Sequence, residues 1–505
     1  MKVFWIALMS IAVTFGSLFG QNGQAKLVER YEFDMKEEGE NISNFAVYTL
    51  KNKGLINVYS HMESNRNTVW VFKMMDKNLK VKKEESIEIS RKLYFQSKYT
   101  TKTHLHVLFR TKKKDYMVIS LNLSTMKLTE VEGEFPAKVY FNKMKVIGDY
   151  AVLDTKSKRE VFLSLINWKT GRTKIIPINI NGVKPKRIFF ENFQVLEGEK
   201  ELFAFISARI DKKVETFALK LDHRGNKKEM FSLTKKYENV VSGISVSKIG
   251  DGEYIYTGTY SKKNSSVSNG LFIGKSTNGK VNFIESYNFL ELNNFLTYLP
   301  AKKQKRIEKK KKRKARRGKE LTYNYLIACH DIIKKGDKYI LLGEAYFPTY
   351  RSEARTTYVN GQASTTYVQV FDGYRYTHAV IIGFDKEGKL VWDNTFKMYP
   401  SYKPYYVKKF ISISEANDKE ISMIFSSGSA IYMKTLDNFN GKTTKEENTD
   451  IIVSVDEDDV ARWSTSETDY WYDRSFVTYG YQKIKNKSGK KKRKRKVYYI
   501  NKIEY

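Results

Sequence analysis

The stretch Thr377–Phe396, THAVIIGFDKEGKLVWDNTF, decides the fold class of this chain. Two apolar runs, Ala379–Phe384 and Leu390–Phe396, flank the polar segment Asp385–Lys389. The Asp of this segment can accept hydrogen bonds from its own turn, and its Gly can adopt a positive φ, which is typical of a β-hairpin turn. The stretch therefore predicts two antiparallel strands joined by a tight turn.

Weaker copies of this hairpin recur along the chain. Tyr and Phe number 35 and 30 while Pro numbers 7, and apolar residues alternate with polar ones over short spans, which favours strands over helices. The predicted turns are spaced by about 50 residues once two insertions, 286–320 and 349–376, are set aside. The turn centres are Leu79, Met126, Gly171, Gly225, Gly279, Gly388, Gly441 and Gly489.

A repeat of this length with four strands in each unit is the sequence signature of a β-propeller. The segment Lys26–Met35 and the C-terminal segments Ser475–Lys485 and Val497–Tyr505 fall outside the full units. Joining them in one blade closes the ring and removes open sheet edges. We therefore expect an all-β fold, a single β-propeller domain over 26–505 with eight four-stranded blades, or seven. A pair of β-sandwich domains is the alternative.

The N-terminal residues 1–20 have the pattern of a signal peptide: one Lys, a mainly apolar run and a small residue at the expected cleavage point. Cleavage after Ala25 and a membrane anchor are the alternatives. The single Cys, Cys329, lies in an apolar run, which indicates a buried thiol rather than a nucleophile, and no intramolecular disulfide can form. The sequence thus predicts an exported chain, in the periplasm or at the outer-membrane periphery, with the cell exterior as the alternative.

The charge is strongly positive, with 90 Lys and Arg against 56 Asp and Glu and a net charge of +34. Such a chain attracts polyanions, and outside the cytoplasm these are acidic glycans, lipid phosphates or acidic protein surfaces. Two clusters carry much of the charge: Lys302–Lys319, expected as a helical arm after Pro300, and Gly489–Lys496.

We predict that these clusters dock on an anionic partner, with a solvated loop as the alternative. Aromatic residues do not interleave with the basic ones, so nucleic acid is not the expected partner. The predicted partner-binding residues are Lys309, Lys310, Lys311, Lys312, Arg313, Lys314, Arg316, Arg317, Lys491, Lys492, Arg493, Lys494 and Arg495.

A second group of polar and aromatic residues brackets an inserted loop, Ser352–Val370. Adjacent strands would bring these residues together for binding, metal coordination or acid–base chemistry, and a structural hydrogen-bond network is the alternative. The group is His330, Asp331, Glu344, Tyr346, Tyr350, Arg351, Asp372, Arg375, Tyr376 and His378.

Enzyme and metal motifs are sparse in the sequence. His104 and His106 share one face of a strand, but no third ligand is near, so packing is the preferred interpretation. We find no nucleophile elbow, no HExxH motif and no phosphate-binding loop. The sequence therefore predicts no metal and no cofactor, and it favours a non-catalytic protein over an enzyme.

The segment Asp385–Trp392, DKEGKLVW, resembles the blade repeat of quinoprotein-like propellers, although the other repeats lack a Trp at this place. The longer pattern HDII, GEAYFPTYR, FDGYRYTHAV and GFDKEGKLVWDN, over His330–Asn394, resembles a family of secreted bacterial propellers from bacteria with type 9 secretion and gliding machinery. The resemblance implies an envelope protein without known catalysis.

Three functions remain open from the sequence. The first is a non-catalytic interaction or scaffold module of the cell envelope, which binds a protein or an anionic partner through one face and the basic arm. The second is an accessory or plug-like subunit of an outer-membrane secretion complex. The third is a hydrolase or lyase acting on an acidic polysaccharide.

Overall fold

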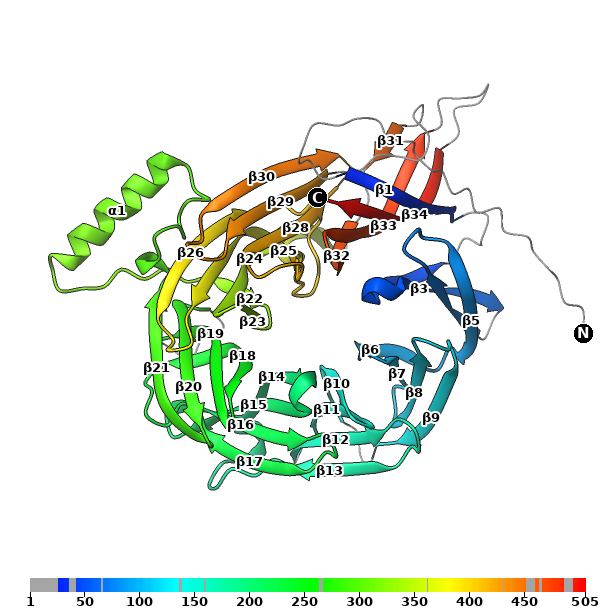
Figure 1. The fold of residues 1–505 in the computed structure, drawn as a ribbon, viewed down its shortest axis with the longest axis horizontal. Helices are drawn as coiled ribbons and strands as arrows, with labels where there is room; N and C mark the ends of the chain where they lie inside the picture. Colours follow the sequence, from blue (N-terminus) through cyan, green and yellow to red (C-terminus); the bar gives the residue numbers. More distant parts are fainter. Residues whose placement is uncertain are drawn as a thin grey trace, which may run out of the picture. The chain divides into compact units, whose positions relative to one another are not determined.

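A computed structural model shows an architecture built almost entirely of β-sheets (Figure 1). It describes residues 26–35, 42–64, 67–135, 139–158, 160–262, 267–360, 362–428, 430–450, 459–462, 466–485 and 494–505. Eight antiparallel sheets follow one another, and six of them have their four strands paired in sequence order. This up-and-down order is that of propeller blades and not of Greek-key sandwiches. The predicted β-propeller of eight blades is confirmed.

The chain divides into two units, and the first comprises 1–136, 410–436 and 443–505. Its described part holds four blades, three of which are built from consecutive strands. These strands are β2 (Ser43–Thr49), β3 (Leu55–Ser64), β4 (Asn67–Met75) and β5 (Val81–Ser90); β6 (Tyr94–Thr100), β7 (His104–Arg110), β8 (Asp115–Asn122) and β9 (Leu128–Glu134); and β27 (Ser412–Ile413), β28 (Glu420–Ser427), β29 (Ala430–Asp437) and β30 (Thr443–Asp450). A short 3-10 helix, η1 (Lys51–Lys53), precedes β3.

The fourth blade of this unit joins both ends of the chain. It contains β31 (Asp459–Arg462), β32 (Ser466–Tyr472), β33 (Ser475–Lys485), β34 (Lys494–Glu504) and β1 (Lys26–Asp34). The N-terminal β1 pairs antiparallel with the C-terminal β34, from Lys26 opposite Glu504 to Asp34 opposite Val497. The predicted closure by N- and C-terminal strands is therefore confirmed, and it covers an edge that each strand would otherwise expose.

The second unit comprises 137–409 and 437–442 and holds the other four blades. Their strands are β10 (Met144–Ile147), β11 (Tyr150–Lys156), β12 (Val161–Asn167) and β13 (Thr173–Pro177); β14 (Ile188–Leu196), β15 (Glu201–Ile210), β16 (Lys213–Asp222) and β17 (Lys227–Ser232); β18 (Val240–Gly250), β19 (Glu253–Ser261), β20 (Gly270–Thr277) and β21 (Lys280–Asn288); and β22 (Leu326–Cys329), β23 (Ile333–Lys335), β24 (Lys338–Val359), β25 (Gln362–Phe384) and β26 (Leu390–Lys397). Helices η2 (Pro185–Arg187), η3 (Glu197–Glu199), η4 (Phe289–Glu291) and α1 (Ala301–Ala315) lie in the connections.

The predicted turn centres are the positions where the backbone turns between the third and fourth strand of a blade. Leu79 and Met126 have φ values of 56° and 64°, and Gly171, Gly225, Gly279, Gly388 and Gly441 have values of 67° to 86°. Positive φ at these positions lets a short loop match the twist of the strands that it joins. Seven of the eight predicted turns are thus confirmed, and the eighth, at Gly489, lies outside the described residues, as does the expected signal peptide 1–20.

Two of these turns, both within the second unit, pack against outer strands of its blades. A Cβ added at Gly388 would lie 2.6 Å from the ring of Phe283 in β21, and one added at Gly441 would lie 2.6 Å from the ring of Trp392 in β26. Trp392 Nε1 also donates a hydrogen bond to the carbonyl of Asn438 (2.8 Å). Trp392, the Trp of the quinoprotein-like repeat, therefore fastens β26, the outer strand of its blade, to the turn that contains Asn438 and Gly441.

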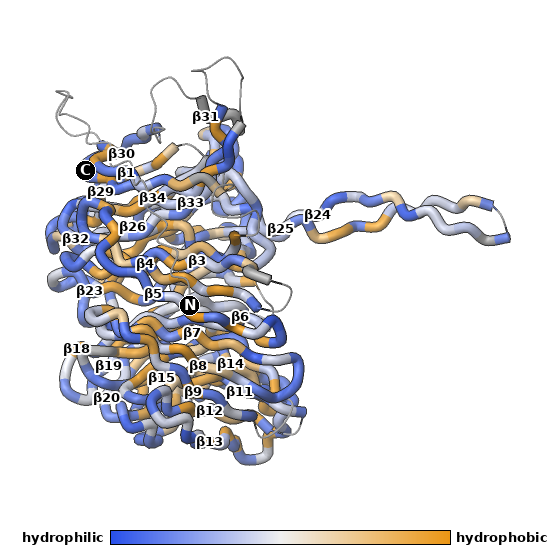
Figure 2. Tube along the Cα trace, turned by 90° about the vertical axis from the view of Figure 1, so that its right-hand side faces the viewer, coloured by the Kyte–Doolittle hydropathy of each residue, from blue (hydrophilic) through white to orange (hydrophobic). Residues whose placement is uncertain are grey.

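Both insertions belong to the last blade of the second unit: the first precedes its strand β22, and the second extends β24 and β25. The basic segment forms α1, as expected, and Gly318 after it has φ 63°. The segment 349–376 was expected to be a loop, and this is wrong, because β24 and β25 run on through it as one long hairpin that turns at Asn360 (φ 51°). Asn-Gly at this tip favours the two-residue hairpin turn, and β-branched and aromatic residues on both sides favour strands. The hairpin projects away from its blade (Figure 2).

Candidate functional site: a basic groove beside an inserted helix

Helix α1 is a strongly basic helix with little packing of its own. It begins after Pro300, whose fixed φ suits a helix start, and none of its residues is buried. Like charges in adjacent turns oppose helix formation in isolation. Two contacts hold it to the segment before it: Gln304 Nε2 donates to the carbonyl of Leu299 (2.7 Å), and Lys311 Nζ donates to the carbonyl of Leu290.

The segment that leads into α1 is firmly anchored on the blade. Phe289 and Phe295 are fully buried and their rings stack at 4.6 Å. Asp393 in β26 accepts hydrogen bonds from the backbone N–H groups of Asn293 (3.0 Å) and Asn294 (2.6 Å), and Thr395 Oγ1 donates to the carbonyl of Asn294 (2.8 Å). The entry to the arm is therefore set by the scaffold.

The segment that returns from α1 is anchored as well. Asn288 Nδ2 donates hydrogen bonds to the side chain of Glu320 and to the carbonyl of Leu321 (3.1 Å), and Lys262 forms an ion pair with Glu320. Burial by itself raises the pKa of Glu320, but the hydrogen bonds from Lys262 and Asn288 outweigh it and lower the pKa below its ordinary value. Because both ends of the arm are anchored by these contacts, helix α1 is held in a defined position.

A cavity of about 720 Å³ lies between α1 and the returning segment. Its wall consists of cationic side chains on one face of the helix, together with one isoleucine and one tyrosine. Lys310 Nζ lies over the ring of Tyr323, 5.6 Å from its centroid, which orients this ammonium group. Among the described residues, no carboxylate lines the cavity, so none of its lining side chains neutralises the positive potential there. The lining residues are Lys303, Arg306, Ile307, Lys309, Lys310, Arg313 and Tyr323.

The other predicted partner-binding residues divide into three sets. Lys312, Arg316 and Arg317 are exposed on the helix and just after it, whereas Lys311 and Lys314 are half-buried. Arg495 forms an ion pair with Glu32 across the terminal blade (Nη1 to Oε1, 2.5 Å), so its role there is structural. Lys491, Lys492 and Arg493 lie outside the described residues, and Lys494 begins β34.

The predicted polar group around 349–376 separates into several contacts. His330 Nε2 donates to Glu344 Oε1 (2.7 Å), and Glu344 is fully buried. His378 lies opposite Ala345 in the sheet while Glu344 lies opposite Ala379, so Glu344 and His378 point to opposite faces of the sheet. The two histidines therefore do not share a site with one carboxylate.

His378 belongs to the anchorage of the basic arm. Its ring stacks on Tyr298 at 3.7 Å and meets Phe295 and Tyr325 edge to face. Burial lowers the pKa of His378 to about 3, so the ring is neutral at physiological pH, and its Nδ1 contacts Thr377 Oγ1 (2.9 Å). This environment is that of a packed core histidine.

The remaining members of the predicted group lie at the base of the hairpin or on it. Tyr376 donates to the carbonyl of Lys408 (2.5 Å), and Asp372 forms an ion pair with Lys403 (2.5 Å). Tyr346 contacts the ring of Tyr376 at 5.5 Å. Three further members are exposed, namely Asp331, Tyr350 and Arg375, and exposed Arg351 pairs with Glu353 (2.6 Å).

The other candidate ligands from the sequence behave as packing residues. His106 is buried, which lowers its pKa to about 3, and its Nδ1 contacts Ser120 Oγ (2.8 Å). Burial raises the pKa of the Cys329 thiol to about 12, so the thiolate is not populated near neutral pH. Within the described ranges, no group of three His, Cys, Asp or Glu side chains is placed to hold a metal ion, and no helix is long and apolar enough to cross a bilayer.

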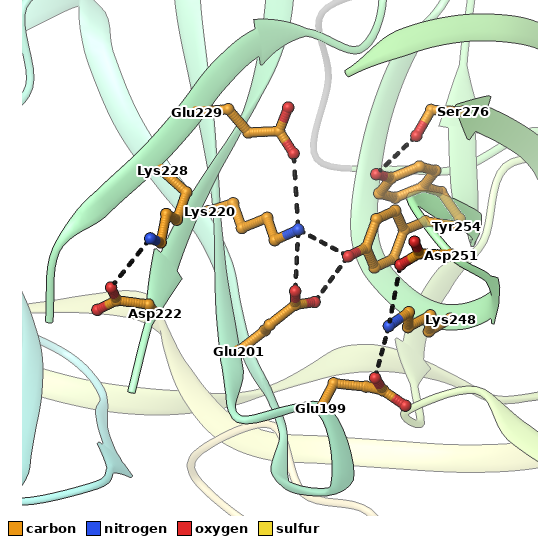
Figure 3. A network of polar contacts seen from close by, with 11 residues as sticks. Glu199, Glu201, Lys220, Asp222, Lys228, Glu229, Lys248, Asp251, Tyr254 and Ser276 are labelled. Carbon is orange, nitrogen blue, oxygen red and sulfur yellow. Dashed lines mark hydrogen bonds and ion pairs between the residues drawn. The ribbon is translucent and has the colours of Figure 1, made fainter. Parts of the chain in front are cut away.

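An ion-pair network that sequence reasoning missed links two blades of the second unit (Figure 3). Lys220 Nζ in β16 lies 2.9 Å from Glu201 and 3.8 Å from Glu229, and it donates to Tyr254 Oη (2.7 Å) in β19 of the next blade. Tyr254 donates in turn to Glu201 (2.7 Å), and Lys248 pairs with Glu199 (2.7 Å). These groups are paired with one another, so the network fastens the blades rather than presenting free charge.

Comparisons with known proteins bear on the fold alone. No protein-family model and no curated protein matches the chain. The chain is similar to the β-propeller domain of Nup133 from Vanderwaltozyma polyspora, with 11% identity over 88% of this chain and 99% of that domain and a TM-score of 0.39.

Two further propellers show the same level of similarity. The WD40 domain of SCAP from fission yeast has 8% identity over 91% of this chain and 98% of that one, with a TM-score of 0.35. The β-propeller domain of the Trilobed protease from Pyrococcus furiosus has 9% identity over 80% and 98%, with a TM-score of 0.35. None of these similarities carries an activity or a partner over to this chain.

Proposed function

We propose that this chain is a non-catalytic binding module that docks on an anionic partner through the groove of α1. The observation that carries the proposal is the cavity of about 720 Å³, whose cationic wall includes no carboxylate from the described part of the chain. The net charge of +34 adds a long-range attraction for the same partners. Tyr323 and Ile307 give the groove an apolar floor, on which the uncharged parts of such a partner can rest.

The fixed geometry of the arm supports the same proposal. Hydrogen bonds to Asp393 hold one end of the arm, and the Asn288–Glu320 pair holds the other. A preorganised cationic surface loses less conformational entropy on binding than a mobile tail does. Binding through it is electrostatic, so the affinity falls as the salt concentration rises.

The test uses heparin as the probe and two matched triple variants of the full chain. Arg306→Gln, Lys310→Gln and Arg313→Gln remove three cations that line the groove, whereas Lys305→Gln, Lys312→Gln and Arg316→Gln remove three that do not. Gln is a good helix former, so both variants keep the helix. At about 1 kcal/mol for each cation, the groove variant loses about 100-fold in affinity and shows a shallower dependence of affinity on salt.

The control variant loses no more than about threefold, because screening by salt weakens cations that do not touch the ligand. Equal losses in the two variants would show that net charge alone binds heparin, and the groove would not be a site. Unchanged binding in the groove variant would exclude α1 as the docking element. Vesicles with anionic lipid, used in the same assay, distinguish a lipid surface from a glycan.

The finer parts of the proposal rest on the sequence. We place the protein in the cell envelope on the pattern of residues 1–20, and a role beside an outer-membrane secretion complex on the resemblance over His330–Asn394. Fractionation of cells that express a C-terminally tagged chain, with N-terminal sequencing of the product, tests both cleavage and location. A hydrolase or lyase is not proposed, because His330 and Glu344 bind each other and His378 packs among aromatic rings.

A further inference from the structure

The hairpin Tyr350–Phe371 is the most exposed part of the second unit's last blade and has no place in the proposed function above. Its two strands pair in continuous register, from Tyr350 opposite Phe371 to Val359 opposite Gln362. Tyr358 is 76% exposed and Tyr367 is 73% exposed, so the described part of the chain leaves these two rings largely uncovered. A two-stranded hairpin in water is marginally stable unless a third strand or a packed face supports it.

One face of this hairpin is uncharged and aromatic. Every second residue along a strand lies on the same face of the sheet. On this face the hairpin carries three tyrosines and one phenylalanine, separated by small or polar residues. The aromatic rows recur every four residues, about 13 Å apart along the strand. This face consists of Tyr350, Ser352, Ala354, Thr356 and Tyr358 from β24 and of Ala363, Thr365, Tyr367, Gln369 and Phe371 from β25.

The two edges of the hairpin differ in charge. On the β24 side, three charged residues, Arg351, Glu353 and Arg355, lie along the strand. On the β25 side, the ten residues Gln362–Phe371, QASTTYVQVF, contain no charge and no proline. Natural proteins protect open edge strands with charges, prolines or bulges, and β25 has none of these over this span.

The backbone of this edge is open within the described part of the chain. β26 pairs with β25 only from His378 toward the core, and β22 pairs with β24 only over Gly343–Tyr346. Beyond the base, where Phe371 meets the ring of Tyr405 at 5.9 Å, each strand of the hairpin pairs with the other alone. The outward N–H and C=O groups of Gln362–Phe371 are thus available to another strand.

We propose that the free edge of β25, over Gln362–Phe371, binds an extended segment of a partner protein as a third strand. Open backbone groups select an extended polypeptide, since a ligand without a regular row of donors and acceptors cannot satisfy them. The neighbouring row of tyrosines selects segments with aromatic or β-branched side chains on the matching face. The added strand also provides the third strand that the hairpin lacks.

The test uses a synthetic peptide that copies Tyr350–Val359, YRSEARTTYV, with capped ends and a fluorescein label. This strand already pairs antiparallel with β25 on its other edge, so its side chains suit the same surface. We expect it to bind the full chain in fluorescence anisotropy, and a scrambled peptide to bind at least about tenfold more weakly. Hydrogen exchange should show new protection of the amides in Gln362–Phe371 when the peptide is bound.

Two variants make the test specific. In the first, Glu353–Val368 is replaced by Asn-Gly, which joins the cross-strand partners Ser352 and Gln369 through a two-residue turn and removes the edge without a change of register. In the second, Thr365→Lys places a charge on the docking strand, and Thr356→Lys is its control on the other strand. Thr356 and Thr365 face each other with their hydroxyl groups 3.1 Å apart, and both are exposed.

The variant with the short hairpin should no longer bind the peptide. Thr365→Lys should weaken peptide binding about tenfold, whereas Thr356→Lys should change it less than about threefold. Equal binding to the short variant, or equal effects of the two lysines, would overturn the proposal. Two further outcomes would also overturn it by assigning another occupant. One is a dimer of the full chain in sedimentation that the short variant does not form; the other is binding of laminarin, a neutral glucan, without amide protection.

Discussion

The two insertions flank the innermost strands of one blade, and both project into solvent. They differ in the contacts that hold them in place. The arm that carries α1 has a buried, hydrogen-bonded base and a charged outer surface. The β24–β25 hairpin has a base held by the contacts of Tyr376 and Asp372, and beyond that base it has a continuous backbone ladder and an outer surface without charge on one face. The difference teaches that the arm is placed by tertiary contacts, whereas the part of the hairpin beyond its base is placed by its own strand pairing.

The largest contrast is expected in the contribution of each insertion to stability. Phe295→Ala at the base of the arm empties a site where the ring contacts Phe289, Tyr325 and His378 at 4.6 to 5.0 Å, and it should lower the free energy of unfolding by about 3–4 kcal/mol. Tyr367→Ala on the hairpin removes a ring that is 73% exposed and should cost less than about 0.5 kcal/mol. Urea denaturation followed by tryptophan fluorescence measures both.

A similar cost for these two variants would contradict the contrast. If Phe295→Ala were nearly neutral, the arm would not be anchored by its aromatic base, and the fixed geometry of the groove would lose its support. If Tyr367→Ala were strongly destabilising, the hairpin would be packed against a part of the protein and its face would not be free. Phe295→Leu, which retains much of the volume, should recover a large part of the loss.

Much of the scaffold could be predicted from the sequence because local signals determine it. Five of the seven described turn centres are Gly, which adopts positive φ without steric cost, and the spacing of the turns reports the blade length directly. The closure of the terminal blade followed from the cost of open edges. The Asn-Gly tip and the flanking β-branched residues of the hairpin were also present in the sequence, but the length of the insertion led to the prediction of a loop.

The candidate site was less accessible to prediction, for reasons of register and tertiary contact. His330, Glu344 and His378 were expected together, and they do come from neighbouring segments: His330 directly follows β22, Glu344 lies in β24 and His378 lies in β25. Whether two side chains share a face, however, depends on register to within one residue, and the β24–β25 pair shifts register between Ala345 and Tyr346. Likewise, the basic residues of α1 were predicted as partner-binding, but Tyr323 was not. Tyr323 lines the groove only because the chain folds back beside the helix after α1.

A smaller contrast between the two insertions is expected in how their contributions to stability depend on pH. Hydrogen bonds from Lys262 and Asn288 lower the pKa of Glu320, so this carboxylate stabilises the return of the arm at pH values above the ordinary pKa of 4.5. This stabilisation is lost as the pH falls through the lowered folded-state pKa of Glu320, because the protonated carboxyl group no longer forms the ion pair with Lys262. The stability difference between the parent chain and Glu320→Gln should shrink between pH 6 and pH 3.

Urea midpoints taken across this pH range measure the effect, which is small because the ion pair is partly exposed. Asp372→Asn at the base of the hairpin is the comparison, since Asp372 also has a lowered pKa through Lys403 but sits beside a segment that depends on strand pairing. A stability difference for Glu320→Gln that grew toward low pH would contradict the assignment. It would mean that the folded state prefers the protonated carboxyl group.

The smallest effect is expected from the hairpin as a whole. Replacing Glu353–Val368 by Asn-Gly deletes residues whose described side chains are all exposed or half-buried, and it preserves the register of the pairs that remain. The melting temperature should therefore stay within about 1 °C of the parent chain, because no core contact is lost. Differential scanning fluorimetry of both chains measures this. A fall of several degrees would show that the hairpin stabilises its blade, and a rise would show that its exposed strands destabilise the parent chain.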